Sequence, residues 1–360
     1  MRRSLDLLID KDDLRRCRLV ESEAPDPSDG QALLSVEHFG LTSNNITYAQ
    51  FGRAMSYWDF FPAEEGWGRM PVWGFAEVAE SRVPGLQEGE RLYGYLPPST
   101  ELLVAPAHVS ERGFVDASPH RAGLPAAYNG YTSTAADPVY EASKEDRQML
   151  LRPLFFTSWL IDDFLGEADV FGAELVVISS ASSRTASALA HLLSLRDGVQ
   201  VVGLTSGRSV SFTEGLGAYH AVLSYEELED LPEGRAVYVD ISGDAAVRSA
   251  VHRHYGQSLE HSSVVGATHH DRMGEVPEDL PGPRPTFFFA PDRVAARSAE
   301  WGRDGLEGRI AEAWHPYVSW TEDWLRVEHE RGGPALLSTY LDLLEGRIDP
   351  ARAHVLTLQD

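Results

Sequence analysis

Two patterns of hydrophobic and polar residues divide the chain near residue 150. Before that point, stretches such as QALLSVEHFGL, MPVWGFAEVAESRVPGLQEGERLYGYLPP and TELLVAP alternate apolar and polar positions, and Gly and Pro residues separate them. A period of two is typical of β-strands that bury one face, and Gly and Pro mark the turns between them. The pattern predicts a mostly-β first part, either a barrel or a curled sheet.

After residue 150, compact apolar stretches alternate with segments of helical period. The predicted strands are AELVVIS, VQVVGLT, AVYVDIS, SSVVGAT and TFFFAP, and helices among them include RTASALAHLLSLR and DAAVRSAVHRHYG. Strands that alternate with helices predict a doubly wound parallel sheet, so the expected fold class is α/β. A strand-like AHVLTL after the last helices suggests that the chain returns to its first domain.

The first strand-to-helix turn of the second part has the position of a dinucleotide site but contains no glycine. A helix N-terminus offers unpaired N–H groups to a pyrophosphate, and glycines usually let the backbone come close to it. Here small hydroxyl residues can donate to phosphate, and an arginine can neutralise one charge. The predicted cofactor-binding residues of this turn are Ser180, Ser182, Ser183, Arg184 and Thr185. The alternative is a plain turn with serine helix caps, which needs no ligand.

The end of the next predicted strand bears on the choice of cofactor. An acid at this point selects NAD, whereas a basic residue accommodates the extra phosphate of NADP. After VQVVGLT the chain has Ser206, Gly207 and Arg208, with no acid before Glu214. We therefore predict that Ser206 and Arg208 bind the cofactor and that the cofactor is NADPH. A solvated loop arginine is the alternative interpretation.

Two more candidates follow the predicted strand SSVVGAT. Gly266 and His269 should lie at the carboxyl edge of the sheet, where the nicotinamide is expected. A histidine there can donate a proton near neutral pH. A surface histidine pair, His269 with His270, is the alternative.

Composition narrows the partners and the compartment. The chain has 31 basic and 55 acidic side chains, and its net charge of -24 repels nucleic-acid backbones and anionic membranes. No apolar stretch approaches the roughly 18 residues that a membrane span needs. The single cysteine, Cys17, excludes an intrachain disulfide and a thiolate zinc site. We predict a cytoplasmic protein that takes a small-molecule substrate and binds neither nucleic acid nor membrane.

Several stretches together resemble the medium-chain dehydrogenase/reductase superfamily, in particular its zinc-independent quinone-oxidoreductase-like branch. They are GQALLSVEHFGLTSNNITYAQFG, VPGLQEGERLYGYLP, VQVVGLTSGRSVSFTEGLGAYHAVLSY, AVYVDISGDAAVRSAVHRHYG and SSVVGATHH. More closely, NNITYA, YWDFFP, PVWGFAEV, SSASSRTA and FFFAPDR resemble a little-characterised microbial offshoot of that superfamily, known as a domain of unknown function.

The resemblance implies a GroES-like, mostly-β catalytic domain over residues 1–150, completed by 311–360, and an inserted Rossmann domain over 151–310. Zinc-dependent relatives carry Gly-His-Glu where this chain has WGF at residues 73–75, and they have a four-cysteine lobe. The resemblance therefore implies a protein without a metal. Family habit also implies a homodimer formed through TFFFAP.

The segment SNNITYA offers the candidate catalytic residues Tyr48, Asn45 and Asn44. Without a metal, hydride transfer to a polarised carbonyl or alkene needs a hydrogen-bond donor for the developing negative charge. The resemblance implies that an asparagine and a tyrosine line the nicotinamide pocket here. Asn45 and Tyr48 are three apart and would share a helix face, but the choice between the two asparagines stays open. Helix-capping asparagines are the alternative.

Aromatic residues form the predicted substrate pocket. They are dense in YWDFFPAEEGWG, where a buried aspartate could also act as an acid or base, and two more follow in LPAAYNGYTST. The candidates are Tyr57, Trp58, Asp59, Tyr128 and Tyr131. Core packing of an irregular loop is an equally good explanation for the first group.

Together these features predict an NADPH-dependent, metal-free reductase of a ketone, an enone or a quinone-like molecule, with an intermediate of secondary metabolism as one candidate substrate. Two other functions stay open. The scaffold could carry non-redox chemistry, as a lyase, isomerase or dehydratase, because the glycines of the turn are missing. It could also be a non-catalytic nucleotide-binding accessory protein, since a fold does not fix a function.

Overall fold

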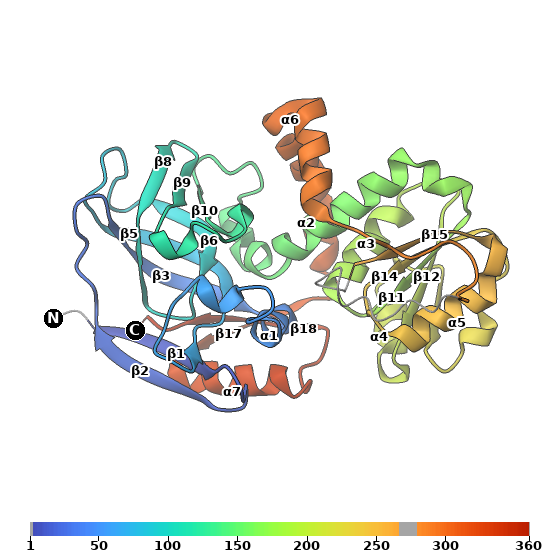
Figure 1. Cartoon of the computed structure of the whole chain (residues 1–360), viewed down its shortest axis with the longest axis horizontal. Coiled ribbons are helices and arrows are strands. Elements are labelled where there is room, and N and C mark those ends of the chain that lie inside the picture. The colour runs from blue at the N-terminus through green and yellow to red at the C-terminus, as the bar shows by residue number, and fades with distance from the viewer. Residues whose placement is uncertain (1–2, 266–278, 360) are drawn as a thin grey trace. The chain divides into compact units, whose positions relative to one another are not determined.

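The computed structural model describes residues 3–265 and 279–359, and the chain folds into two compact units (Figure 1). One unit contains Met1–Leu150 and Leu325–Asp360, and the other contains Leu151–Trp324. The expected return of the chain at residue 311 is therefore too early, because helix α6 (Ala290–Thr321) continues through that point. Trp314 and Tyr317 of α6 pack their rings on Phe155, with centroids 5.3 and 4.6 Å away, and keep this stretch in the second unit.

The first unit is built mainly from antiparallel strands. Its larger sheet has nine strands in the order β17-β18-β3-β5-β6-β10-β9-β8, with β7 paired to β3, and its smaller sheet has the order β2-β1-β4. The strands are β1 (Arg3–Asp10), β2 (Cys17–Glu23), β3 (Ala32–Leu41), β4 (Trp67–Gly68), β5 (Val72–Ser81), β6 (Arg91–Leu96), β7 (Glu101–Val104), β8 (Pro106–Ser110), β9 (Gly113–Asp116), β10 (Gly130–Ser133), β17 (Arg326–Arg331) and β18 (Arg352–Thr357). The helices are α1 (Ser43–Gln50) and α7 (Gly333–Leu344).

The second unit contains a six-stranded parallel sheet in the order β13-β12-β11-β14-β15-β16. Its strands are β11 (Leu175–Ser179), β12 (Gln200–Thr205), β13 (Ala221–Ser224), β14 (Ala236–Asp240), β15 (Leu259–Val264) and β16 (Thr286–Phe287). Besides α6, its helices are α2 (Glu145–Glu167), which begins in the first unit, α3 (Arg184–Ser194), α4 (Val210–Gly215) and α5 (Ala245–Tyr255). The strand order reverses between β11 and β14, as in a doubly wound sheet. The predicted α/β class, with a mostly-β part and a Rossmann sheet, is confirmed.

The burial of the strands explains the two hydrophobic patterns. Every residue of β11 and β14 is buried, because parallel strands at the centre of a doubly wound sheet are covered on both faces. By contrast, β8 has no buried residue and β5 leaves positions such as Glu77 exposed. A strand with one covered face alternates, and a strand with two covered faces does not.

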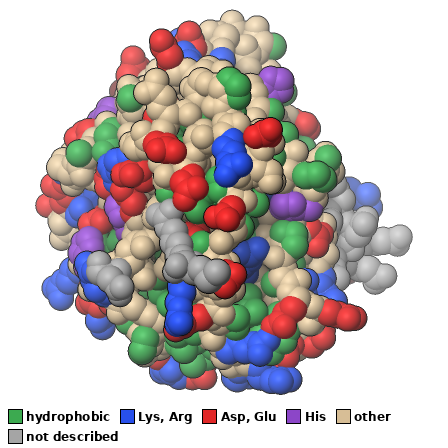
Figure 2. Space-filling view, turned by 90° about the vertical axis from the view of Figure 1, so that its left-hand side faces the viewer, with side chains coloured by type: hydrophobic (Ala, Val, Ile, Leu, Met, Phe, Trp, Pro, Cys, Tyr) green, Lys and Arg blue, Asp and Glu red, His purple; other side chains and the backbone are tan. Residues whose placement is uncertain are grey.

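The described helices include none that is both long enough and apolar enough to cross a membrane. On the face of the protein shown in Figure 2, acidic side chains are spread over much of the surface, with Lys and Arg among them. This distribution agrees with the excess of acidic residues in the composition.

Candidate functional site

The serine turn, residues 180–183, joins β11 to α3 in the second unit. Ser180 adopts the left-handed conformation with φ of 54°, and the Ser183 amide donates to the Ser180 carbonyl at 2.8 Å. The Ser183 hydroxyl then caps α3 by accepting from the Ala186 amide at 3.2 Å. A serine thus occupies the strained position that a glycine normally takes, at a cost of about 1–2 kcal/mol.

A glycine of the neighbouring strand supplies the space that the turn lacks. Gly203 lies on β12, and a Cβ atom there would stand 2.9 Å from the Cβ of Ala181 and 2.8 Å from the ring of Tyr219. The Ala181 amide donates to the Leu204 carbonyl at 2.9 Å, and the Tyr219 hydroxyl donates to the Ala181 carbonyl at 2.8 Å. The close approach of turn and strand therefore depends on Gly203 rather than on a glycine in the turn.

The polar groups around the turn differ in whether they keep a hydrogen-bond donor that a phosphate could use. Thr205 donates to the Ser182 hydroxyl at 3.1 Å, so the Ser182 oxygen accepts while its own proton can still be donated to a phosphate. The Ser180 amide donates to the Tyr225 hydroxyl at 2.9 Å, and the Thr185 carbonyl accepts from Ser158 at 2.8 Å. Ser182 is the candidate with the chemistry that phosphate binding requires, and Tyr225 is a neighbour that sequence reasoning missed.

The two arginine candidates of the second unit have different surroundings. Arg184 lies beside Tyr317 of α6, and burial lowers the pKa of its guanidinium to about 10. Arg208 is exposed on the short 3-10 helix Gly207–Ser209 that follows β12, next to Ser206, whose hydroxyl donates to that of Ser209 at 3.2 Å. Arg208 thus occupies the accessible position that its predicted role needs.

An acid also reaches the end of β12, which the sequence order did not reveal. Glu226 follows β13, and its carboxylate oxygen lies 3.9 Å from where a Cβ of Gly207 would stand. Two neighbouring strands bring their ends to the same edge of the sheet, so a residue far along the chain becomes a neighbour. Arg208 and Glu226 therefore place opposite charges at the end of β12. This is the position where a dinucleotide fold distinguishes NADP from NAD.

The carboxyl ends of β11 and β14 are tied together at the point where the strand order reverses. Fully buried Asp240 accepts from the hydroxyls of Ser179 and Ser242, each at 3.0 Å, and from the Gly243 amide at 2.9 Å. The Arg248 guanidinium lies 3.7 Å from the other carboxylate oxygen. This network links the end of β11 to the end of β14 beside the serine turn. The predicted cofactor contacts Gly266 and His269 lie outside the described residues.

Helix α1 of the first unit separates the two asparagine candidates. The Asn45 side chain is buried and serves the helix start: its oxygen accepts from the Thr42 amide at 2.7 Å, and its nitrogen donates to the Pro71 carbonyl at 2.9 Å. Asn44 is half-buried and hydrogen-bonds to the Tyr48 hydroxyl one turn later. Of the two asparagines between which the sequence left the choice open, Asn45 caps the helix and Asn44 is the neighbour of the Tyr48 hydroxyl.

The Tyr48 hydroxyl has a second partner that comes from β5. The indole N–H of Trp73 donates to the Tyr48 oxygen at 3.3 Å. Burial raises the pKa of Tyr48 well above its usual value, and the bonds from Trp73 and Asn44 only partly oppose that increase. Tyr48 therefore stays protonated near neutral pH. Its oxygen accepts from the indole while its proton can be offered to another acceptor.

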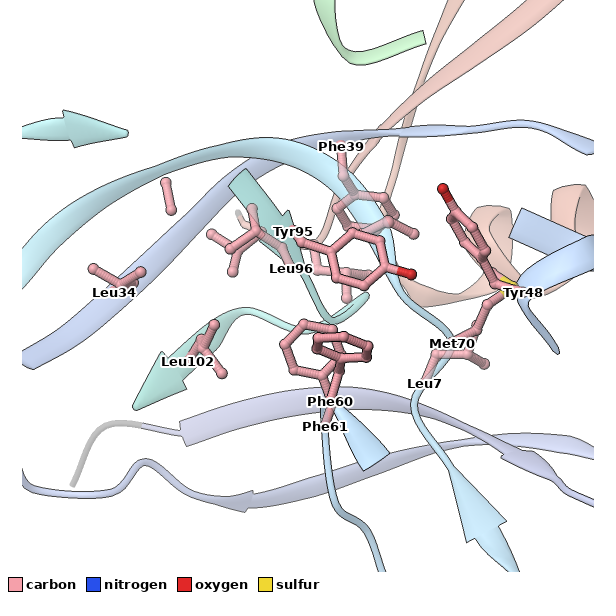
Figure 3. Packing of buried hydrophobic residues seen from close by; sticks show 14 of the residues in the cluster. Leu7, Leu34, Phe39, Tyr48, Phe60, Phe61, Met70, Tyr95, Leu96 and Leu102 are labelled. Carbon is pink, nitrogen blue, oxygen red and sulfur yellow. The ribbon is translucent and has the colours of Figure 1, made fainter. Parts of the chain in front are cut away.

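Four tyrosines form what we call the tyrosine cluster: Tyr48, Tyr57, Tyr95 and Tyr128. Tyr57 and Tyr128 hydrogen-bond to each other, and burial raises the pKa of Tyr57 to about 12. The ring of Tyr128 lies 4.7 Å from that of Tyr95 and 5.9 Å from that of Tyr57. Figure 3 shows Tyr95 above Phe60 and Phe61, with its hydroxyl directed towards Tyr48. The structure thus brings together Tyr48, Tyr57 and Tyr128, three of the predicted residues.

Three other predicted pocket residues do not line the tyrosine cluster. The buried ring of Trp58 packs directly on the backbone of Gly52 and Gly68. Cβ atoms at these two glycines would stand only 2.1 and 2.4 Å from the ring. Asp59 is exposed, so it lacks the burial that an acid or base role required. The Tyr131 hydroxyl donates to the Tyr95 carbonyl at 2.7 Å and accepts from Arg121 at 3.3 Å. Trp58 and Tyr131 are therefore buried packing residues, and Asp59 is a surface residue.

Among the described residues, one group has the side chains for a metal ion: Glu328, Glu330 and His354. They lie on β17 and β18, not on the elements that carry the tyrosine cluster. Arg352 pairs with Glu328, and Thr339 donates to Glu330, so protein groups already bind both carboxylates. At residues 73–75, where zinc-dependent relatives carry Gly-His-Glu, this chain has the indole that contacts Tyr48.

Residues 39–349 match the family model described as a protein of unknown function, DUF2855. The chain belongs to this family. The resemblance to a domain of unknown function is thereby confirmed. No curated protein sequence matches the chain.

Solved structures share the fold of the whole chain at low sequence identity. CurA from Vibrio vulnificus in complex with NADPH has a TM-score of 0.60 at 13% identity, with 100% of both chains covered. The quinone oxidoreductase from Coxiella burnetii has a TM-score of 0.56 at 16% identity, covering 99% of this chain and 100% of that chain. The yhdH oxidoreductase from Salmonella enterica in complex with NADP has a TM-score of 0.56 at 14% identity, with 99% and 100% covered. These similarities confirm the predicted fold.

Proposed function

We propose that the protein is an NADPH-dependent reductase that needs no metal and acts on a ketone, an enone or a quinone-like small molecule. The observation that carries the proposal is Tyr48, a buried and neutral hydroxyl whose oxygen already accepts from the Trp73 indole at 3.3 Å. A donor bond to a phenol oxygen strengthens the phenol's own proton as a donor. Tyr48 is thus suited to stabilise negative charge on a substrate oxygen.

The serine turn fits a dinucleotide phosphate. Ser182 keeps a proton to donate, the N-terminus of α3 follows directly, and Gly203 gives the turn room against β12. In this proposal exposed Arg208, which follows β12, pairs with the additional phosphate of NADPH. When bound, NADPH supplies the hydride. The NADPH and NADP complexes of two structurally similar proteins support this choice of cofactor.

The side chains of the first unit have separate tasks in the proposed reaction. Tyr48 donates to the oxygen on which charge develops, and Trp73 and Asn44 hold the Tyr48 oxygen in place. Uncharged rings surround this donor, which excludes water and strengthens its hydrogen bond. Because Tyr48 is neutral throughout the physiological range, it stabilises the oxygen by donation and does not act as a base. The alkoxide or enolate that hydride transfer leaves takes its proton from solvent when product is released.

The proposal is tested with purified full-length protein. NADPH binding is measured by calorimetry, and NADPH oxidation at 340 nm is followed with a panel of ketones, enones and quinones, because NADPH absorbs near this wavelength and NADP does not. A dissociation constant well below that for NADH is expected, together with oxidation by at least one substrate class. Absence of NADPH binding would contradict the proposal.

One observation favours non-redox chemistry as a second candidate. Several polar groups of the serine turn are already bonded within the protein, including the Ser180 amide and the Ser183 hydroxyl. A turn of this kind can persist after cofactor binding is lost, leaving Tyr48 to serve a lyase, isomerase or dehydratase. Conversion of a substrate without a change in NADPH absorbance would support this second candidate over the reductase.

The proposed assembly is a homodimer through the edge of the parallel sheet. β16 is the last strand of that sheet, and Phe289 just beyond it is 49% exposed, so an apolar side chain lies beside an open sheet edge. Light scattering of the purified protein is expected to give the mass of two chains, and Phe289→Asp is expected to give the mass of one.

A further inference from the structure

Tyr95 lies at the centre of the tyrosine cluster and was not among the site residues predicted from the sequence. It is on β6, directly opposite Trp73 of β5, and its ring has 0% exposure. Its ring centroid is 5.0 Å from that of Trp73 and 5.5 Å from that of Tyr48, which it meets edge-on. Figure 3 shows its hydroxyl directed towards Tyr48.

The Tyr95 hydroxyl differs from the other hydroxyls of the cluster in having no hydrogen-bond partner among the described residues. Tyr48 is bonded to Trp73 and Asn44, and Tyr57 is bonded to Tyr128. Burial of an unpaired hydroxyl disfavours folding, so such groups are rare in cores. One explanation is a ligand atom that pairs with the hydroxyl when it binds.

We propose that Tyr95 is a second catalytic hydrogen-bond donor, which together with Tyr48 binds the carbonyl oxygen of a flat, uncharged ketone. The assignment of that oxygen to a substrate rests on the proposed reductase function. A carbonyl oxygen has two lone pairs and accepts two such bonds. Two neutral donors stabilise the negative charge that forms on this oxygen during reduction without bringing a charge of their own into an apolar site.

Neighbouring groups keep both donors protonated and define the class of ligand. Burial raises the pKa of Tyr95 well above its usual value, and nearby Tyr48, Tyr128 and Tyr57 raise it further. Arg121 opposes this only partly. The rings in contact with Tyr95 are uncharged, so the site suits a neutral planar molecule and disfavours a carboxylate or a phosphate.

Tyr128 is the least buried ring of the tyrosine cluster. Tyr128 is only half-buried, and it ends a short 3-10 helix, Ala126–Tyr128, whose other residues are exposed. Its ring packs on that of Tyr95 at 4.7 Å. In the proposed binding step this side chain moves outward and gives up its hydrogen bond to Tyr57, and the ligand takes the space beside Tyr95.

The test compares two probes that differ by one carbonyl oxygen, 1-tetralone and tetralin, on full-length protein without cofactor. Dissociation constants are measured by ligand-detected NMR for the wild type and for Tyr95→Phe. The ratio of the two constants is expected to shift by about 10- to 100-fold towards tetralin in Tyr95→Phe, because the hydrogen bond to the ketone is lost. Tyr255→Phe is the matched control, since it removes another buried hydroxyl without a described partner, in the second unit.

A stability measurement separates ligand binding from a structural role. Because the Tyr95 hydroxyl has no partner among the described residues, Tyr95→Phe is expected to unfold in urea at the same or a higher midpoint than the wild type. An unchanged probe ratio overturns the proposal, as does failure of the wild type to bind 1-tetralone. A shifted ratio in a protein that does not oxidise NADPH keeps Tyr95 as a donor and refutes the reductase function alone.

Discussion

The tyrosine cluster and the serine turn both lack the feature that the superfamily resemblance leads one to expect, and they compensate in different ways. In the first unit, the indole of Trp73 contacts Tyr48 at the segment where zinc-dependent relatives carry Gly-His-Glu. In the second unit, the missing glycine of the turn is balanced by Gly203 on the next strand. The first difference decides which side chain stands beside Tyr48, whereas the second preserves a backbone path.

The two regions also differ in how their hydroxyl groups are used. In the serine turn, the hydroxyls that have described partners mainly hold the protein together, as Ser183 does for α3. In the tyrosine cluster, the Tyr95 hydroxyl has no described partner. A buried group that does not help its own fold is a stronger indication of ligand binding than a well-bonded one. If this contrast holds, changes in the tyrosine cluster affect substrate chemistry, and changes in the serine turn affect cofactor binding.

The largest effect is expected in the tyrosine cluster. Tyr48→Phe removes the donor to the substrate oxygen and should lower kcat by about 100- to 1000-fold, while the dissociation constant for NADPH stays the same. Steady-state kinetics and calorimetry measure the two quantities. Tyr340→Phe, which removes a hydroxyl that donates to the Leu14 carbonyl at 2.8 Å, is the control and should keep its kcat. A loss of NADPH binding in Tyr48→Phe would show that the two regions are not separate.

A backbone effect is expected in the serine turn. Gly203→Ala places a methyl group 2.9 Å from the Cβ of Ala181 and 2.8 Å from the ring of Tyr219, and should lower the free energy of unfolding by about 1–3 kcal/mol. Urea denaturation measures this change. The double variant Gly203→Ala with Ala181→Gly should recover part of the stability, because it removes one of the two contacts. If Gly203→Ala were as stable as the wild type, Gly203 would not be needed to make room for the serine turn.

A smaller effect concerns the choice of cofactor at the end of β12. Arg208→Ala should weaken NADPH binding by about tenfold and leave NADH binding unchanged, since only NADPH carries the extra phosphate. Glu226→Gln should have the opposite sign and strengthen NADPH binding by about two- to fivefold at low salt. Calorimetry with both cofactors provides the comparison. Equal effects of Arg208→Ala on both cofactors would place Arg208 away from the ribose.

Variants of two adjacent serines distinguish phosphate binding from helix capping within the turn. Ser182→Ala should weaken NADPH binding by about three- to tenfold, because it removes a donor to phosphate, and should change stability little. Ser183→Ala removes the N-cap of α3 and should lower the free energy of unfolding by about 1 kcal/mol. If both variants only lose stability, the turn serves the fold and not a cofactor.

The smallest expected effect is that of pH on kcat. The tyrosines of the cluster have pKa values raised by burial, to about 12 for Tyr57, so kcat should be flat between about pH 6 and 9. Above the unfolded value near 10, the unfolded chain loses these protons first, so stability should fall as pH rises towards the folded values. A kcat that changes near pH 7 would indicate that another titrating group takes part in the rate-limiting step. Urea midpoints at pH 8 and about pH 11 check the stability trend.

Much of the fold follows from local patterns. The buried runs at β11 and β14 and the alternation before residue 150 are visible in the sequence because they reflect how many faces of a strand are covered. The position of the serine turn follows from its place between a strand and a helix. The end of the second unit was harder to predict, because α6 keeps its aromatic residues in the core of that unit until Thr321.

The site was less predictable because its contacts cross between elements. Asn45 and Asn44 are neighbours in sequence, but only the position of Pro71 shows that Asn45 is used as a cap. The aromatic pairs in WGF and YGY, at residues 73–75 and 93–95, were a usable signal for Trp73 and Tyr95, since alternate residues share a strand face. Without the register of β5 on β6, nothing placed the two aromatic pairs opposite each other.

The sequence by itself determined the class of fold, the glycine-free turn and the choice of Tyr48 as a candidate, because each depends on residues close together in the chain. Only the tertiary structure decided that Gly203 makes room for the turn, that Glu226 reaches the end of β12, and that the Tyr95 hydroxyl meets Tyr48 with no partner among the described residues. These features depend on which strands are neighbours and in what register. A linear pattern specifies the faces of a strand, but the partner strand specifies what each face meets.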